Sequence, residues 1–430
     1  MEDTRPADRT TAIPDVPTAP PRPGSGRLWL TAAVIAGATA LVAYGLSALR
    51  PSLPSVLPDY GDWIGGYYRI GSFLRWIVAD GTESEYAKTE LSGLGMILGA
   101  WLAHCIQQRR KGGRWQGFAI SYGTGLWPWG AGSAAMGMIA SNLAWGWTVP
   151  ATGAWQPTFA PFVSVPPAVV LVYGAGWAVS LTGAALGVLL TTPVALLAVN
   201  YVCVPLGLPG VVGATTGMWA SALIGFAVCR VLPWMPRPLA AEEPRPEREP
   251  EEPRPEREKD SPAPAAEHAG ERQGPVWVAR RVLADFSEAQ FYGNEWASVG
   301  LLLGTLFAFL LNPMLPAAGG LWPQVLASQV LTGAVAVVLW RSGWSKAGWY
   351  PSFVPVVSVA PATVLAYGGS VQSVVVGAVF GAVAAPPLAA AIGNRMPAHF
   401  HPFIGNVVSM TVCCATFVPL LALLPGFTTS

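Results

Sequence analysis

PTFAPFVSVPPAVVLVYG at residues 157–174 recurs as PSFVPVVSVAPATVLAYG at residues 351–368. The two stretches are identical at 12 of their 18 positions, too many for chance. The likeness continues upstream: GLWP at 125–128 recurs at 320–323, and Trp145 matches Trp340. Further upstream, Arg75, Asp80, Glu83 and Glu90 match Arg280, Asp285, Glu288 and Glu295. An internal duplication therefore covers residues 70–233 and 275–425.

The composition is typical of a membrane protein. Of the 430 residues, 52% are hydrophobic and 11% are charged, whereas a soluble domain carries about 25% charged residues. Many of the 19 Trp residues lie near the ends of apolar segments, as in the aromatic belts at membrane interfaces. The net charge of +1 gives no reason to expect a nucleic-acid partner.

Each copy contains five apolar segments. A backbone surrounded by lipid must satisfy its own hydrogen bonds, so each segment should be mainly helical. The segments are 90–107, 118–145, 158–176, 178–199 and 210–230, and then 295–311, 321–340, 352–369, 371–393 and 403–424. With a first helix at 28–48, which is long enough to span, we predict an all-α polytopic membrane protein with about 11 transmembrane helices as 1+5+5.

Basic residues predict that the two copies face opposite sides of the membrane. The first loop of copy one holds Arg109, Arg110, Lys111 and Arg114, whereas its counterpart in copy two is uncharged. The next loop reverses the pattern, since only copy two carries basic residues there. Positive residues favour the cytoplasmic side. We therefore expect two inverted-topology repeats in the plasma membrane, with the N-terminus and central linker in the cytoplasm and the C-terminus outside.

The chain divides accordingly. PRPEREPEE at 244–252 and PRPEREKD at 253–260 cannot form a packed core. The expected parts are a disordered tail at 1–27, the first helix at 28–48, an external segment with an amphipathic helix at 49–89, the first repeat at 90–236, a disordered linker at 237–274, and an amphipathic helix plus the second repeat at 275–426.

The repeated proline segments are the candidate binding site. Proline removes a backbone donor and crowds the preceding turn, so we predict broken helices or re-entrant segments at Pro157, Pro161, Pro167, Pro351, Pro355 and Pro361. Such irregular backbone is tolerated at membrane depth where it lines a cavity or packs on protein. The alternative is a kinked helix that only packs. The candidate substrate-binding residues are Ser164, Ser358, Tyr173, Tyr367, Asn200, Asn394 and Asn406.

Glu90 and Glu295 begin equivalent helices, and we consider them for ion coupling. The competing interpretation is a first-turn acid that stabilises a helix N-terminus. The paired glycines Gly95/Gly99 and Gly300/Gly304 should let helices approach closely. The five cysteines lie in or beside apolar segments without a CxxC pair, so we expect small core residues and neither a disulfide set nor a metal site. No cofactor is predicted.

Inverted repeats favour transport, because two halves of opposite orientation can alternate around one central site. We therefore expect a transporter or permease for a small solute, with the lipid bilayer and that solute as partners and a homo-oligomer as an option. A scaffold or assembly protein is the second hypothesis, and it predicts a bundle without a polar cavity. An enzyme acting on a lipid-linked substrate is the third, although HExxH and GxSxG are absent from the sequence.

Overall fold

The computed structural model describes residues 25–109, 124–239 and 273–427. Within these ranges every regular element is a helix and no strand occurs, so the all-helical prediction is confirmed there. Most of the predicted tail, the basic loop from Arg110 to Arg114 and most of the linker lie outside the described residues.

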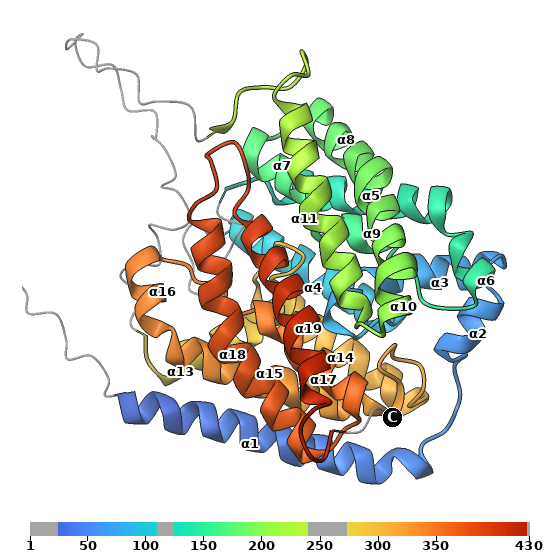
Figure 1. Ribbon diagram of the computed structural model, residues 1–430, viewed down its shortest axis with the longest axis vertical. Coiled ribbons are helices and arrows are strands. Elements are labelled where there is room, and N and C mark those ends of the chain that lie inside the picture. Colours follow the sequence, from blue (N-terminus) through green and yellow to red (C-terminus); the bar gives the residue numbers. More distant parts are fainter. Residues whose placement is uncertain (1–24, 110–123, 240–272, 428–430) are drawn as a thin grey trace, which may run out of the picture.

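The N-terminal helix α1 (Ser25–Leu49) runs along one edge of the molecule and packs on α13 and α15 of the second copy (Figure 1). A short 3₁₀ turn, η1 (Arg50–Ser52), follows it. The chain then passes from α1 to the first copy through α2 (Tyr60–Gly65) and α3 (Ile70–Asp80).

The first copy continues with α4 (Glu90–Arg109), α5 (Trp127–Trp145) and the short α6 (Thr148–Thr152). The proline segment forms η3 (Ala160–Val163) and α7 (Val165–Tyr173). One long helix follows, with two π-helical stretches: α8 (Trp177–Leu186), η4 (Gly187–Thr191), α9 (Thr192–Ala198), η5 (Val199–Cys203) and α10 (Val204–Leu206). The last helix is α11 (Gly210–Cys229).

The second copy repeats this order. It consists of α13 (Pro275–Ala284), η7 (Asp285–Ser287), α14 (Glu295–Leu311), η8 (Gly319–Leu321), α15 (Trp322–Leu339), α16 (Arg341–Ala347), η9 (Val354–Val357), α17 (Val359–Tyr367), α18 (Val371–Gly393) and α19 (Phe403–Leu421). Each of the ten apolar segments expected from the sequence therefore contains a helix, whereas α2, α3, α6, α13 and α16 lie outside these segments.

Six of the described helices are long and apolar enough to cross a membrane. They are Ser25–Ser52, Trp177–Leu206, Gly210–Cys229, Gly319–Leu339, Val371–Gly393 and Phe403–Leu421, so the predicted number of eleven spans is not confirmed. Large apolar side chains lie on the outside, including Leu41, Leu189 and Val371 at 71%, 67% and 80% exposure. Water disfavours so much exposed apolar surface, and the helices are compatible with an integral membrane protein.

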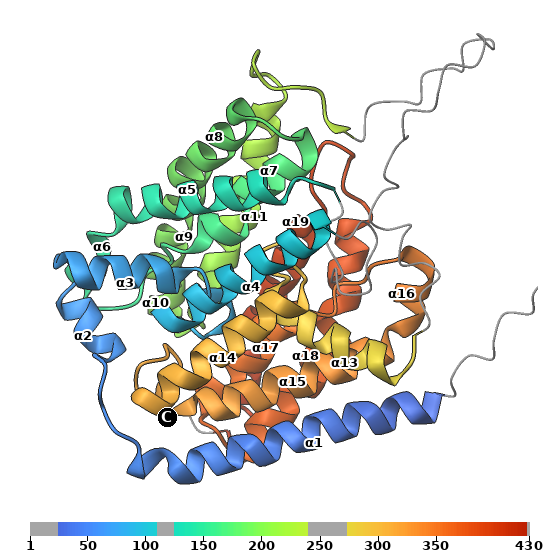
Figure 2. The ribbon, with the colours of Figure 1, turned by 180° about the vertical axis from the view of Figure 1, so that it is seen from behind.

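The two copies meet through equivalent glycines. A Cβ placed on Gly95 would clash with the backbone of Gly300, and a Cβ on Gly300 would clash with that of Gly95. Gly99 likewise lies against Trp296 O, and Gly304 against Leu91 O. Because the contacts run in reverse order along the two helices, α4 and α14 are antiparallel (Figure 2). Reciprocal contacts of this kind are what a two-fold relation between two units produces.

A second contact between the copies joins α11 and α19, which lie side by side in Figure 1. Thr215 Oγ1 and Thr411 Oγ1 are 2.7 Å apart and share a hydrogen bond. The two helix pairs leave a space between the copies, described below.

Each proline segment is broken at the same residue. Ser164 (φ −144°, ψ −118°) separates η3 from α7, and Ser358 (φ −140°, ψ −93°) separates η9 from α17. Pro161 and Pro355 pack on the equivalent glycines Gly187 and Gly381, where an added Cβ would lie 2.9 Å from the proline ring. The nine-residue helices α7 and α17 each rise only about 14 Å, less than half the hydrocarbon layer.

Candidate functional site

The site begins with a turn that both copies retain. Tyr86 (φ 59°) and Phe291 (φ 63°) are the non-glycine residues with positive φ in the described ranges, and they are equivalent. Tyr86 N donates to Glu83 O and Phe291 N donates to Glu288 O, both at 2.9 Å. Positive φ is unfavourable for aromatic residues, so the surrounding packing must hold both turns.

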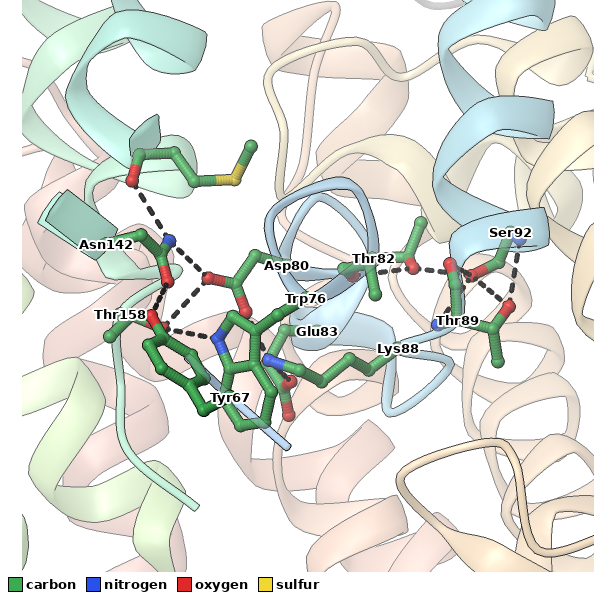
Figure 3. Close-up of polar contacts among 12 residues, drawn as sticks. Tyr67, Trp76, Asp80, Thr82, Glu83, Lys88, Thr89, Ser92, Asn142 and Thr158 are labelled. Carbon is green, nitrogen blue, oxygen red and sulfur yellow. Dashed lines mark hydrogen bonds and ion pairs between the residues drawn. The ribbon is translucent and has the colours of Figure 1, made fainter. Parts of the chain in front are cut away.

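In the first copy, Glu83 of this turn and Asp80 at the end of α3 both contact one lysine (Figure 3). Lys88 Nζ forms an ion pair with Asp80 and lies 2.8 Å from Glu83 Oε2. The same ammonium group lies 3.8 Å from the ring centre of Trp76. Burial raises the pKa of Glu83 despite the opposing effect of Lys88. Burial acts to lower the pKa of Lys88, but Asp80 and Glu83 raise it overall.

Asp80 also connects this cluster to the helices of its own copy. Its Oδ2 accepts hydrogen bonds from Asn142 Nδ2 on α5 (2.8 Å) and from Thr158 Oγ1 before η3 (2.9 Å), as Figure 3 shows. Thr158 also accepts a hydrogen bond of 3.1 Å from Trp76 Nε1. The acidic turn is therefore fixed to the proline segment.

The second copy builds the same cluster with an arginine. Arg281 forms ion pairs with Asp285 and Glu288, and its guanidinium carbon lies 4.6 Å from the ring centre of Trp344. Ser352, the equivalent of Thr158, donates a hydrogen bond of 3.1 Å to Asp285. Burial raises the pKa of Asp285 against the effect of Arg281.

The acids occupy equivalent positions, but the cations do not. Arg281 stands at the position of Trp76, whereas Gly293 stands at the position of Lys88. Each copy thus supplies one buried cation from a different point in the chain. The shared requirement is a counter-charge beside the acidic pair, because an unpaired buried charge is strongly destabilising.

A tryptophan lies beside the outer carboxylate of each cluster, which is Glu83 in the first copy and Glu288 in the second. Trp349 Nε1 donates a hydrogen bond of 2.6 Å to Glu288 Oε1. The equivalent Trp155 lies close enough to Glu83 to lower the pKa of that carboxyl, although its Nε1 does not form a hydrogen bond of regular geometry.

Between the copies lies a cavity of about 720 Å³. Equivalent residues of both copies line it, as the duplication would place them around a central space. These pairs include Glu83/Glu288, Tyr86/Phe291, Trp155/Trp349, Phe159/Phe353 and Val163/Val357. Residues of α11 and α19, among them Met218 and Asn406, complete the wall. A large, mostly apolar cavity with a few polar groups is the usual form of a ligand site.

The charged groups at this wall are carboxylates. Glu83 and Glu288 line the cavity, and none of its described lining residues is Lys or Arg. His401 also lines it, but burial lowers its pKa to about 4, so the imidazole is neutral at pH 7. No group of three His, Cys, Asp or Glu suited to a metal ion occurs in the described part of the chain.

Of the seven predicted substrate-binding residues, two line the cavity and five do not. Tyr367 and Asn406 line it. Ser164 and Ser358 do not, because each hydroxyl donates a hydrogen bond of 2.6 Å to a carbonyl four residues earlier. Tyr173 is buried away from it.

The two remaining asparagines also lie elsewhere. Asn200 is inside the π-helical stretch η5, where its amide bonds Gln156 at 2.8 Å. The helix expected over 178–199 does not end there but continues through Asn200 to Leu206. Asn394 is exposed at the end of α18.

Glu90 and Glu295 pair with equivalent arginines. Glu90 Oε1 lies 3.5 Å from Arg75, and Glu295 Oε1 lies 2.7 Å from Arg280. Neither glutamate lines the cavity. Each carboxylate is thus paired with an arginine outside the cavity, and a role in ion coupling stays a prediction.

The sequence predicts that Glu83 and Glu288 are equivalent and that Glu83 belongs to an external segment. The structure buries both, at 8% and 2% exposure. The positions of Trp155 and Trp349 beside these acids were not predicted from the sequence. Their recurrence at equivalent positions was the available signal.

Comparison of the chain with protein-family models, with curated proteins and with solved structures finds no match.

Proposed function

We propose that this chain is an integral membrane transporter or permease, whose substrate site is the cavity between its two copies. The observation that carries the proposal is that equivalent residues of both copies line one large cavity. A scaffold would need no such space. In this proposal the chain is not an enzyme and uses no cofactor, and its partners are the bilayer and the solute.

The antiparallel packing of α4 on α14 supports inverted repeats. Equivalent helices that cross a bilayer antiparallel to each other cross it in opposite directions, as the basic residues also predict. In the proposed topology the chain has eleven spans in the plasma membrane, with the N-terminus and linker in the cytoplasm and the C-terminus outside.

The cavity is asymmetric, which supports alternating exposure. On α17 it is lined by Ala362, Leu365, Ala366 and Tyr367. The equivalent residues on α7, Ala168, Leu171, Val172 and Tyr173, do not line it. Two inverted halves can exchange conformations. We infer that a second state closes the α17 side and opens the α7 side.

Thiol labelling in sealed vesicles tests this proposal. The five cysteines Cys105, Cys203, Cys229, Cys413 and Cys414 are first replaced by Ala. Ala362→Cys and Ala168→Cys are then made separately, with Ala222→Cys on α11 as a buried control outside the cavity. A membrane-impermeant thiol reagent is added to one side at a time.

Alternating exposure predicts labelling at 362 from one side and at 168 from the other, with no labelling at 222. Labelling of both positions from the same side would contradict the inverted arrangement. Failure to label 168 under any condition would contradict the second state.

A further inference from the structure

We propose that the cavity binds an organic cation with an aromatic or apolar body. This inference deepens the proposed function and rests on it for transport, whereas binding itself can be measured separately. It is carried by the charge of the wall, by the aromatic rings beside that charge, and by the shape of the cavity.

The charge at the wall is negative. In each copy two carboxylates share one cation, which leaves one formal negative charge when all groups are ionised. The cations are turned away from the cavity: Lys88 and Arg281 are both fully buried and absent from its lining. The outer acids, Glu83 and Glu288, do line it. An anion would therefore meet like charge and no exposed counter-charge.

Aromatic rings also line the cavity, and Trp155 and Trp349 lie beside Glu83 and Glu288. Trp155 and Phe159 lie on the first-copy side, and Trp349 and Phe353 on the second. The face of an aromatic ring attracts a cation, by about 2 kcal/mol or more where water is excluded. The protein already uses this interaction at both of its own buried cations. Tyr60 also lines the cavity, and its hydroxyl has no hydrogen-bond partner among the described residues.

The cavity is elongated. Along α19 its lining extends from Phe403 to Pro419, a rise of about 24 Å. The rest of the lining is mostly apolar and includes Leu365 on α17 and Val418 and Pro419 on α19. A ligand with a cationic group at the acids and an apolar body along α19 fits both regions.

Two probes of similar shape and opposite charge test the proposal on the purified full-length protein. Tetraphenylphosphonium is a cation and tetraphenylborate is an anion, and both carry four phenyl rings. Equilibrium dialysis should show saturable binding of the phosphonium and at least about tenfold weaker binding of the borate. Equal or tighter binding of the borate would overturn the proposal, and this comparison needs no variant.

Glu83→Gln and Glu288→Gln locate the binding. Each removes the formal negative charge of one copy and should weaken phosphonium binding about tenfold or more. Asp62→Asn makes the same change at an exposed residue outside the cavity and should leave binding unchanged. Phosphonium affinity that is the same in all three variants as in the unaltered chain would show that the probe binds elsewhere, and would overturn the proposal.

Failure of this inference is distinguishable from failure of the proposed function. Alternating labelling at 168 and 362 without phosphonium binding would reject the cation and leave transport standing. Phosphonium binding that depends on Glu83, without alternating labelling, would support a cation-binding site and reject transport.

Discussion

Glu85 Oε2 accepts a hydrogen bond of 2.6 Å from Nε2 of Gln290, the residue at the equivalent position of the second copy. Glu85 and Gln290 therefore lie where the two copies meet, and Gly95 likewise contacts its own equivalent, Gly300. Glutamate at both positions would bring two buried carboxyl groups together, which is unfavourable when both are ionised. A carboxyl paired with a neutral amide avoids that cost.

We predict that Glu85 is protonated in the folded protein at pH 7. Burial raises its pKa to about 8 from an ordinary value of 4.5. The folded state then holds a proton that the unfolded state releases, so Glu85 contributes stability that is lost as the pH rises from about 5 through 8. The melting temperature in detergent should fall over this range, and Glu85→Gln should remove that part of the fall.

Gln290→Glu provides the opposite change. It creates the pair of carboxyl groups that the duplication avoids, so it should destabilise the protein by several kcal/mol at pH 8 and less at pH 5. A pH profile of Glu85→Gln indistinguishable from that of the unaltered chain would contradict the assignment of the proton.

Lys88 and Arg281 come from non-equivalent positions, so we predict that the cation of the first copy can be moved to the position that Arg281 occupies in the second. Lys88→Gly should destabilise the first copy by about 3–5 kcal/mol, because it leaves Asp80 and Glu83 without their counter-charge. Adding Trp76→Arg places a guanidinium where Arg281 stands in the second copy, and should recover part of that loss. Thermal unfolding measures both effects. A double variant less stable than Lys88→Gly alone would argue against equivalent acidic clusters.

The glycine contact predicts equal sensitivity on both sides. Gly95→Leu and Gly300→Leu should each prevent close packing of α4 on α14, because the added side chain would overlap backbone atoms. Size-exclusion chromatography should show a loss of monodisperse protein. Gly132→Leu on α5 is the matched control, because nothing lies within 4 Å of a Cβ there. Tolerance of Gly300→Leu would contradict the reciprocal contact.

Much of the fold could be predicted from the sequence, because apolar segments long enough for a membrane must form helices. The break near Ser164 and Ser358 was visible as repeated prolines. The register of α4 on α14 was not predictable, although Gly95 and Gly300 indicated where helices would approach closely. Two equivalent glycines can pack on each other or on other helices, and the sequence does not distinguish these arrangements.

The site was harder to predict for a specific reason. Asp80, Glu83 and Lys88 are close in sequence and charged, a pattern that usually indicates a solvated segment. Only the packing of α3 and of the proline segment buries them, through contacts such as Thr158 with Asp80. Ser164 and Ser358 drew attention because they recur, but their hydroxyl groups bond to their own backbone.

Protons should compete with the cationic probe. Burial raises the pKa of Glu83, so its carboxylate takes up a proton at a higher pH than an exposed one and loses its charge. Lys88, Asp80, Tyr60 and Trp155 face this carboxyl, and Lys88 opposes the shift. Phosphonium affinity should therefore be highest at alkaline pH and fall as the pH decreases through the pKa of Glu83, by up to about tenfold per pH unit.

Equilibrium dialysis between pH 5 and 9 measures this dependence, and two variants identify its origin. Glu83→Gln should flatten the curve, because the titrating group has gone. Glu85→Gln should leave most of it, since Glu85 does not line the cavity. His401 does not contribute, because its pKa of about 4 lies below the range. A curve that is steep in Glu83→Gln and flat in Glu85→Gln would contradict this prediction. It would show that the competing proton binds Glu85, at the contact between the copies. Protonation would then affect phosphonium binding through the Glu85–Gln290 contact and not through a charge at the wall of the cavity.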